Sequence, residues 1–149
     1  MQVGDGADKP DLTGQVLEPL FLGVRARITF RMERATPILP TEDLKTAKSF
    51  YVDQLGFSVT FEVSEDGHSG LLGIARGTIE MTLDSPMSGH GRNACIALHV
   101  DDADRYFREW SAKVRVLRAP KDEVWGARTF DLVDPSGNTI FVMGPLSGK

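Results

Sequence analysis

The chain has 149 residues, enough for one domain or for two small modules that share a core. Its composition, 41% hydrophobic and 26% charged, is typical of a soluble globular protein. The net charge of −4 argues against a nucleic-acid-binding surface, which needs clustered Lys and Arg. One cysteine excludes an internal disulfide and a multi-cysteine zinc site, and it fits a reducing compartment. We therefore predict a cytoplasmic protein.

Residues 1–34 are predicted to be an N-terminal extension that is accessory or partly disordered. The segment 20–24 is apolar, but charged residues flank it on both sides, which argues against a signal peptide. No apolar stretch approaches the roughly 20 residues that a membrane-spanning helix needs. Val24–Phe30 is predicted to add to the following domain as an edge strand, and Met32 is an alternative natural start.

Residues 35–83 are predicted to form a module of the order β-α-β-β-β. Its opening strand, 36–39, contains Pro37, which cannot donate to a strand ladder and favours an edge or a strand start. Thr41 is the predicted N-cap of a helix that ends at Gly56. In the next strand, 57–63, apolar and polar residues alternate, which predicts one buried face. A hairpin turn at 66–67 precedes the strand 71–75, and a turn at 76–77 separates that strand from the last one, 78–83.

Residues 94–144 are predicted to form a second module with the same order of elements, after a polar linker at 84–93. The opening strand spans 95–100, and Asp101 and Asp102 begin a helix whose apolar face includes Trp110, which we assign to the core. The remaining strands are predicted at 114–117, 127–133 and 139–143, with the turn 134–138 before the last strand. Residues 145–149 form a C-terminal tail.

The two modules repeat one pattern of residue types at a constant offset of 59. Tyr51 corresponds to Trp110, and Asp43 corresponds to Asp102. Further along, the similarity of Thr78–Glu80 to Thr139–Phe141 suggests that the offset drifts to 61. Two copies of one unit normally build a pseudo-symmetric body. We predict an α+β fold of paired βαβββ modules, whose curved mixed sheets surround a cavity between matched strands.

Two groups of residues resemble a known family. The opening Thr36-Pro37-Ile38-Leu39-Pro40 with Leu55-Gly56-Phe57, and the closing Trp125-Gly126 with Asp134-Pro135-Ser136-Gly137-Asn138, resemble the glyoxalase/bleomycin resistance/extradiol dioxygenase (vicinal oxygen chelate) superfamily, in particular its bleomycin-resistance branch. The likeness covers about residues 35–144. It implies paired βαβββ modules, a homodimer, and a ligand groove formed in part by the partner subunit.

The resemblance also says where a metal would be bound in an enzyme of this superfamily. The four ligand positions fall on Thr36, Glu80, Cys95 and Phe141. Catalytic metal centres need three or four N or O donors, and here only Glu80 is such a donor. We therefore expect no metal, no other cofactor and no catalytic residue, and we lean toward a protein that is not an enzyme.

The three histidines leave an alternative open. His99 has the same strand parity as Cys95 and should share its face, whereas His68 lies at a hairpin and His90 in the linker. Two histidines and Glu80 would make an atypical facial triad for a lyase, isomerase or dioxygenase. A Cys–His arrangement has no local signature, and a lone strand cysteine is more often a buried apolar filler.

Without a metal, the predicted cavity becomes a ligand-binding pocket with apolar walls and few polar groups. Its predicted lining is Trp125, His99, Glu80, Phe141, Cys95, Thr36 and His68. By resemblance, Trp125 would stack on the planar aromatic tail of a cationic glycopeptide. Four arginines near the groove would oppose a cation: Arg76, Arg92, Arg118 and Arg128. The prediction is a metal-independent, homodimeric protein that sequesters an aromatic or cationic small molecule, with bleomycin-type antibiotic resistance as one form of it.

Overall fold

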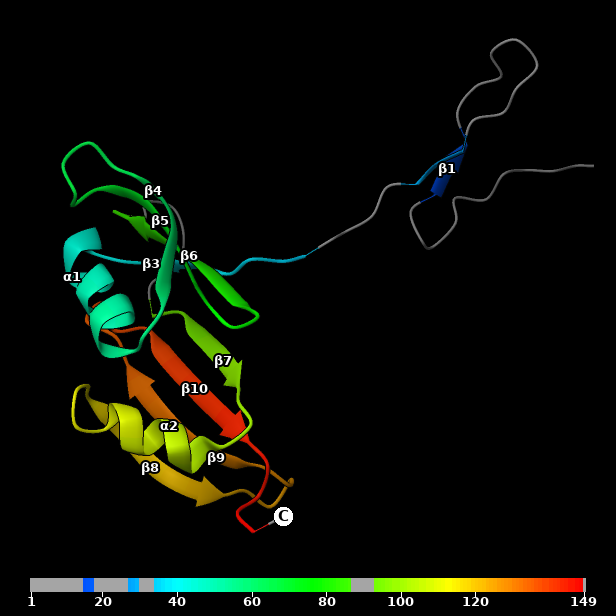
Figure 1. Cartoon of the computed structure of the whole chain (residues 1–149), viewed down its shortest axis with the longest axis vertical. Helices are drawn as coiled ribbons and strands as arrows, with labels where there is room; N and C mark the ends of the chain where they lie inside the picture. The colour runs from blue at the N-terminus through cyan, green and yellow to red at the C-terminus, as the bar shows by residue number, and fades with distance from the viewer. Residues whose placement is uncertain (1–14, 18–26, 30–33, 87–92, 149) are drawn as a thin grey trace, which may run out of the picture. The chain divides into compact units, whose positions relative to one another are not determined.

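The computed structural model describes residues 15–17, 27–29, 34–86 and 93–148 (Figure 1). Contacts divide the chain into two units, residues 1–35 and 36–149. In the first unit, β1 (Gln15–Leu17) pairs antiparallel with β2 (Arg27–Thr29) in a separate two-stranded sheet. The addition of 24–30 to the following domain as an edge strand stays a prediction, and Met32 and His90 lie outside the described residues. None of the described helices is long and apolar enough to span a membrane.

The first module of the second unit is a four-stranded sheet with one helical segment. Its elements are β3 (Ile38–Pro40), α1 (Leu44–Lys48), the π-helical continuation η1 (Ser49–Gln54), β4 (Ser58–Val63), β5 (Gly70–Arg76) and β6 (Ile79–Ser85). The strand order is β3-β6-β5-β4, and β3 runs parallel to β6 while the other neighbours are antiparallel.

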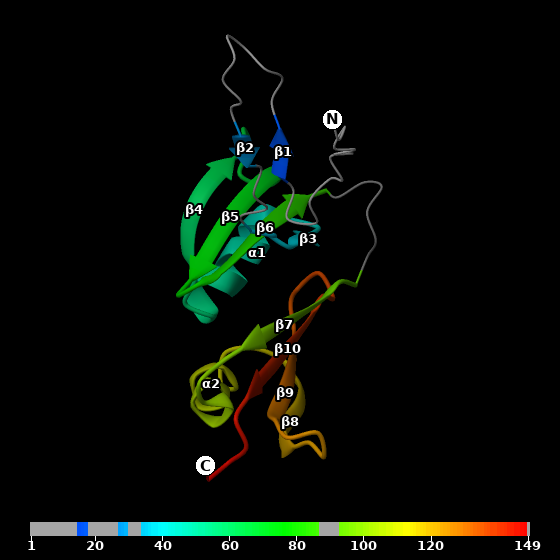
Figure 2. The same ribbon diagram turned by 90° about the vertical axis from the view of Figure 1, so that its right-hand side faces the viewer.

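The second module repeats this topology (Figures 1 and 2). It comprises β7 (Cys95–His99), α2 (Ala103–Trp110), β8 (Val116–Asp122), β9 (Arg128–Val133) and β10 (Thr139–Gly144). The strand order is β7-β10-β9-β8, with β7 parallel to β10. The predicted α+β fold of paired βαβββ modules is confirmed.

The register of the sheets corrects one part of the repeat. In the first module Ile38 pairs with Thr82, and in the second Ala97 pairs with Phe141. Both partners are related by the offset of 59, so the offset does not drift to 61 in the last strand. Phe141 therefore corresponds to Thr82, and Glu80 corresponds to Thr139, the partner of Cys95.

Each helix begins at an aspartate at the same place in the repeat. Asp43 accepts a hydrogen bond from the Thr46 amide at 2.8 Å, and Asp102 accepts one from the Arg105 amide at 3.0 Å. These bonds satisfy amides that have no partner inside the helix. Asp43, and not Thr41, is thus the N-cap of the first helix; the Thr41 side chain is buried.

A β-bulge changes the predicted faces of the strand at 57–63. Val59 pairs with Ile74, but Phe61 pairs with Gly73, so Thr60 is an extra residue in β4. Because of this extra residue, Val59 lies on the helix side of the sheet while Phe61 and Val63 lie on the opposite side, and all three side chains are exposed. The prediction of a single buried face along 57–63 is therefore wrong. In β8 a bulge at Leu117 occupies the corresponding place, since Val116 pairs with Leu132 and Arg118 with Asp131. A second register shift, between Arg118 and Lys121, distinguishes β8 from β4.

The core of each module lies between its sheet and its helix. Tyr51, Leu55 and Trp110 are almost fully buried there, so the predicted core position of Trp110 is confirmed. The strands contribute Leu72, Ile74, Met81, Leu83, Phe130, Leu132, Ile140 and Val142. Burying one such side chain stabilises the fold by about 1.5–3 kcal/mol, which anchors both sheets to their helices.

A buried polar cluster joins the two modules. The Asp134 carboxylate accepts hydrogen bonds from the Tyr51 hydroxyl and from the Asn138 side-chain amide, each at 2.8 Å. Asn138 also donates to the Pro40 carbonyl at 2.8 Å, and Ser136 accepts from the Glu42 amide at 3.0 Å. Burial, and then the Asp134 charge, raises the pKa of the Tyr51 hydroxyl, which stays a donor. The turn 134–138 thus fastens the second module to the first helix.

The matching turn of the first module makes the reciprocal contact. Arg76 donates to the Leu55 carbonyl and to both carboxylate oxygens of Glu109, at 3.0 and 3.3 Å. Its guanidinium lies 5.1 Å from the ring centre of Tyr106 and 5.6 Å from that of Trp110. The arginine lowers the pKa of Glu109. Each module therefore places a turn against the helix of the other.

Candidate functional site: the inner faces of the two sheets

Each sheet has an inner face, defined here as the side turned away from its own helix. Figures 1 and 2 show α1 along one side of the first sheet and α2 along one side of the second. Alternation along the strands then assigns the side chains. The inner face of the first sheet carries Ile38, Phe61, Val63, Leu71, Gly73, Glu80, Thr82 and Asp84. The inner face of the second carries Cys95, Ala97, His99, Arg118, Thr129, Asp131, Thr139, Phe141 and Met143.

The first inner face is apolar and open. Phe61 and Val63 are 44% and 63% exposed, and Ile38 is 52% exposed. The Phe61 ring lies across Gly73, where an added Cβ would be 2.2 Å from Cε1 of Phe61. Glycine is therefore required for the ring to occupy this position. The acidic side chains of Glu80 and Asp84 on β6 belong to the same face.

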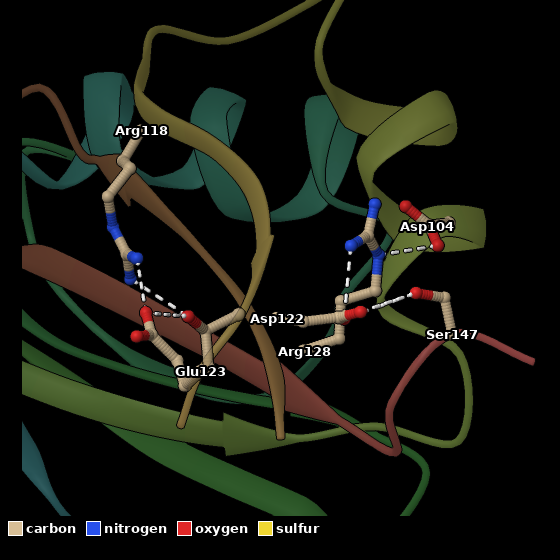
Figure 3. Close-up of polar contacts among 7 residues, drawn as sticks. Asp104, Arg118, Asp122, Glu123, Arg128 and Ser147 are labelled. Carbon is tan, nitrogen blue, oxygen red and sulfur yellow. Dashed lines mark hydrogen bonds and ion pairs between the residues drawn. The ribbon is translucent and has the colours of Figure 1, made fainter. Parts of the chain in front are cut away.

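The second inner face is organised by Arg118. Its Nε donates to Asp131 at 3.0 Å, its Nη1 to Glu123 at 2.5 Å, and its Nη2 to Thr129 at 2.9 Å. Figure 3 shows the Arg118 guanidinium turned toward Glu123. The Asp131 and Glu123 carboxylates raise the pKa of Arg118, and the arginine lowers the pKa of Glu123. The guanidinium also lies 6.0 Å from the ring centre of Phe141.

Trp125 lies at the tip of the hairpin between β8 and β9. The hairpin closes by a bond from the Glu123 amide to the Ala127 carbonyl, 2.7 Å, and Gly126 has a positive φ of 98°. At the tip, Trp125 is 57% exposed and Val124 is fully exposed. Glu123, which bonds to Arg118, connects this tip directly to the inner face.

The sequence-predicted residues are spread over the two faces. Cys95 and His99 are exposed on β7, as their shared parity predicted, and they pair with Thr139 and Met143. The expectation that Cys95 is a buried filler is wrong. Thr36 precedes β3, since that strand begins at Ile38, and it is exposed.

His68 belongs to a different part of the first module. Its Nδ1 lies 2.5 Å from Oδ1 of Asp43, so it contacts the cap of the first helix. Hydrogen bonds from the Thr46 side chain and then from His68 lower the pKa of Asp43 to about 2. The structure thus gives this histidine partners in the Asp43 cap and in the 66–69 turn of the first module.

The side chains at the superfamily's metal positions do not fit a divalent metal. Register makes Thr139 the counterpart of Glu80, and neither Thr139, Thr36 nor Phe141 is a donor of the kind that Zn²⁺ or Fe²⁺ prefers. Within 34–86 and 93–148, no group of three or more His, Cys, Asp or Glu side chains is placed to hold a metal ion. We therefore derive no chemical step through a metal.

The four arginines expected near the groove have different surroundings. Arg118 faces the inner side, whereas Arg76 lies between the modules. Arg128 bonds to Asp104 of α2 at 2.7 Å and so faces the helix side, and Arg92 lies outside the described residues. Arg76 and His99 both line a cavity of about 220 Å³ at the junction of the modules, with Tyr106 and Trp110.

The predicted site residues did not include Glu123, Thr129, Asp131 or the exposed Phe61. The strand predicted at 114–117 in fact continues to Asp122 as β8. Pro120 interrupts its pattern, and a proline is tolerated there because β8 is an edge strand. Had the strand been extended, its antiparallel register with 127–133 would have placed Arg118 near Asp131.

The sequence profile of the Glyoxalase/Bleomycin resistance protein/Dioxygenase superfamily matches residues 31–142. The chain belongs to this superfamily. The sequence matches none of the curated proteins.

Solved structures share the fold of this superfamily member. A bleomycin resistance determinant encoded on the transposon Tn5 is 24% identical, with a TM-score of 0.64 over 76% of this chain and 98% of its own. A bleomycin-binding protein from Streptomyces verticillus, complexed with copper(II)-bleomycin, is 23% identical, with a TM-score of 0.64 over 79% and 100%. TnmS3, an antibiotic binding protein from Streptomyces sp. CB03234, is 25% identical, with a TM-score of 0.63 over 78% and 100%.

Proposed function

We propose that this superfamily member is a metal-independent binding protein that sequesters an aromatic or cationic small molecule, with a bleomycin-type antibiotic as the first candidate. The observation that carries the proposal is Trp125, a large aromatic side chain held exposed at a hairpin tip beside the inner face of the second sheet. An exposed indole offers a flat surface for an aromatic ligand. The bleomycin-binding and antibiotic-binding proteins that share the fold support this choice of ligand.

The charges on the inner faces favour a cation. Carboxylates on these faces and at the hairpin base outnumber the basic groups: Glu80, Asp84, Glu123 and Asp131 against Arg118 and Lys121. Arg118 is already paired with Asp131 and Glu123, so it repels a ligand cation less than an unpaired arginine would. The groove therefore has a net acidic lining.

We also propose that a second copy of the chain completes the groove. The support is the exposed apolar patch of Ile38, Phe61, Val63 and Leu71 on the first inner face. Water-exposed clusters of this kind commonly mark interaction surfaces. Sedimentation equilibrium should give a dimer for the wild type and a monomer for Phe61→Asp. Leu117→Asp, which alters a similarly exposed apolar residue outside the patch, is the matched control and should remain dimeric.

Calorimetric titration with metal-free bleomycin tests the function. The wild type should bind saturably, Trp125→Phe should bind nearly as well, and Trp125→Ala should bind roughly 10-fold more weakly because the stacking contact is lost. At 100 times its dissociation constant, the ligand should add roughly 2.7 kcal/mol to the free energy of unfolding. The proposal would be rejected if the wild type gave no heat of binding. It would also be rejected if Trp125→Ala bound with the same affinity as the wild type.

Elemental analysis distinguishes the alternative, a metal-dependent lyase, isomerase or dioxygenase with an atypical site around Glu80. The binding-protein proposal predicts no stoichiometric transition metal in protein purified without chelators. About one tightly bound metal per chain, lost in Glu80→Gln and retained in the neighbouring inner-face variant Asp84→Asn, would favour the enzyme.

A further inference from the structure

The hairpin of β8 and β9 is tied down on both of its sides, close to its tip. On the inner side, Arg118 donates to Glu123 at 2.5 Å and to Thr129 at 2.9 Å, and the Thr129 hydroxyl donates to the same Glu123 oxygen at 2.9 Å. Glu123 is the first residue after β8, and Thr129 lies on β9. One carboxylate is thus held from both strands, two residues before Trp125.

The other side of the hairpin is held by Arg128. Its Nε donates to Asp104 of α2 at 2.7 Å, and its Nη1 donates to Asp122 of β8 at 3.1 Å. The Ser147 hydroxyl of the C-terminal segment donates to the same Asp122 carboxylate at 2.9 Å. Figure 3 shows Arg128 between Asp104 and Asp122, with Ser147 beside Asp122, and Arg118 facing Glu123.

These contacts are poorly explained as contributions to stability. The Arg118 side chain is 35% exposed, and ion pairs in such surroundings typically contribute about 0–1 kcal/mol. The tip beyond them buries little: Val124 is fully exposed and Trp125 is 57% exposed. A hairpin tip with so little burial would ordinarily be among the most mobile parts of a fold. The main effect of the Arg118 and Arg128 contacts is therefore to fix the position of the hairpin tip.

We propose that Arg118 is a positioning residue for ligand binding: by holding Glu123 against Thr129, it keeps the backbone of 123–126 in one conformation and so pre-organises Trp125 for its ligand. Arg128 has the same role on the helix side of the hairpin. The inference rests on the proposed function, in which Trp125 contacts the ligand. An ordered tip binds more tightly because less conformational entropy is lost on association.

The first measurement needs no ligand. Backbone ¹⁵N relaxation should give an order parameter of about 0.85 for the amides of Val124, Trp125 and Gly126 in the wild type, and below about 0.6 in Arg118→Gln. Arg118→Lys should be intermediate, because an ammonium keeps the charge but lacks the planar fork that reaches Glu123 and Thr129 together. Arg76→Gln, which removes another partly buried arginine–glutamate pair, should leave these amides rigid.

The second measurement is a calorimetric double-mutant cycle with metal-free bleomycin. Arg118→Gln should weaken binding roughly 3- to 10-fold in the wild-type background. In the Trp125→Ala background it should cause no further loss of affinity, because Arg118 acts through the tryptophan. A loss that persists without Trp125 would mean that Arg118 touches the ligand itself, and it would overturn the positioning role.

The two measurements separate the two proposals. Unchanged order parameters in Arg118→Gln overturn the inference even if the antibiotic binds well. A wild-type protein that does not bind metal-free bleomycin overturns the proposed ligand, and the order parameters then still decide whether Arg118 holds the tip. Circular dichroism and thermal melting of each variant show that any loss occurs in a folded protein.

Discussion

At the matched bulges, the two sheets present different chemistry from the same backbone. The first sheet places Phe61 over Gly73, and the second places Arg118 against Asp131. The core residues that the strands place against the helices are apolar in both modules. Inner-face residues are free of that constraint and differ. The repeat has therefore kept the strand order and the core, while the inner faces of the two sheets have diverged.

The contacts between the modules show the same divergence. Tyr51 and Trp110 occupy matched positions, yet the turn that meets Tyr51 carries a carboxylate, Asp134, and the turn that meets Trp110 carries a guanidinium, Arg76. The aspartate is buried, whereas Arg76 is partly exposed. This comparison predicts unequal energies for contacts that are related by symmetry.

The largest effect is expected for Asp134→Ala. The substitution leaves the buried Tyr51 hydroxyl and the Asn138 amide without their acceptor, so the free energy of unfolding should fall by about 3–5 kcal/mol in urea denaturation. Asp131→Ala, which removes a partly exposed carboxylate on the inner face, is the control and should lower it by about 1 kcal/mol. Equal losses in the two variants would mean that the Asp134 cluster does not hold the modules together.

Arg76→Met tests the reciprocal contact and should have a smaller effect. The variant loses the hydrogen bonds to Glu109 and Leu55 and the cation–π contact with the Tyr106 ring. The methionine side chain still packs on the aromatic rings as an apolar group. We expect a loss of about 1–2 kcal/mol in the same assay. A loss as large as that of Asp134→Ala would show that the two contacts, despite their different chemistry, are energetically equivalent.

Exchanging the inner-face pairs tests whether the two bulges are equivalent. Gly73→Asp alone should destabilise the protein by about 1–3 kcal/mol, since its Cβ would collide with the Phe61 ring and with the Thr60 hydroxyl. Phe61→Arg removes the ring and allows an ion pair like Arg118–Asp131 to form. The loss in free energy of unfolding in the double variant Phe61→Arg/Gly73→Asp should therefore be about 1 kcal/mol smaller than the sum of the two single losses. Strictly additive losses in the double-mutant cycle would show that the matched register does not reproduce the geometry of the second sheet.

The smallest effect concerns the matched helix caps. Because Asp43 has a folded-state pKa of about 2, below its ordinary value of 3.8, its ionised form stabilises the native state at every pH above about 3.8. That contribution is lost as the pH falls from about 3.8 to about 2. The difference in urea midpoint between the wild type and Asp43→Ala should therefore shrink across this window. By NMR titration, Thr46→Val should raise the Asp43 pKa more than His68→Ala, because the threonine hydrogen bond has the larger influence.

Much of the fold could be predicted from the sequence because the core is periodic. The offset of 59, the helical spacing that includes Tyr51 and Trp110, and the order of strands all depend on local apolar patterns, which the structure bears out. The bulge at Thr60 could not be predicted, since Phe57, Val59, Phe61 and Val63 are all apolar and an inserted residue leaves no mark on their alternation. The cap was missed because Thr41 and Asp43 are both good capping residues, and only the backbone shows which one begins the helix.

The candidate site was less predictable because its contacts depend on register across strands. Arg118 and Asp131 are brought together by β8 and β9, and the predicted strand ended too early to pair them. The motif at 134–138 was useful as a mark of the family, but nothing in its spacing indicates that its aspartate is buried against Tyr51. The contact between Trp125 and a ligand stays a prediction.

The reciprocal turns have a consequence for dissecting this chain. Residues 36–86 expressed alone would leave Tyr51 and Arg76 facing water, and residues 93–149 alone would expose Asp134 and Glu109. Each fragment contains the partner groups that the other lacks. Coexpressed as separate polypeptides, the two halves should reconstitute one folded body by fragment complementation, which makes the linker between them a suitable site for a split-protein sensor of ligand.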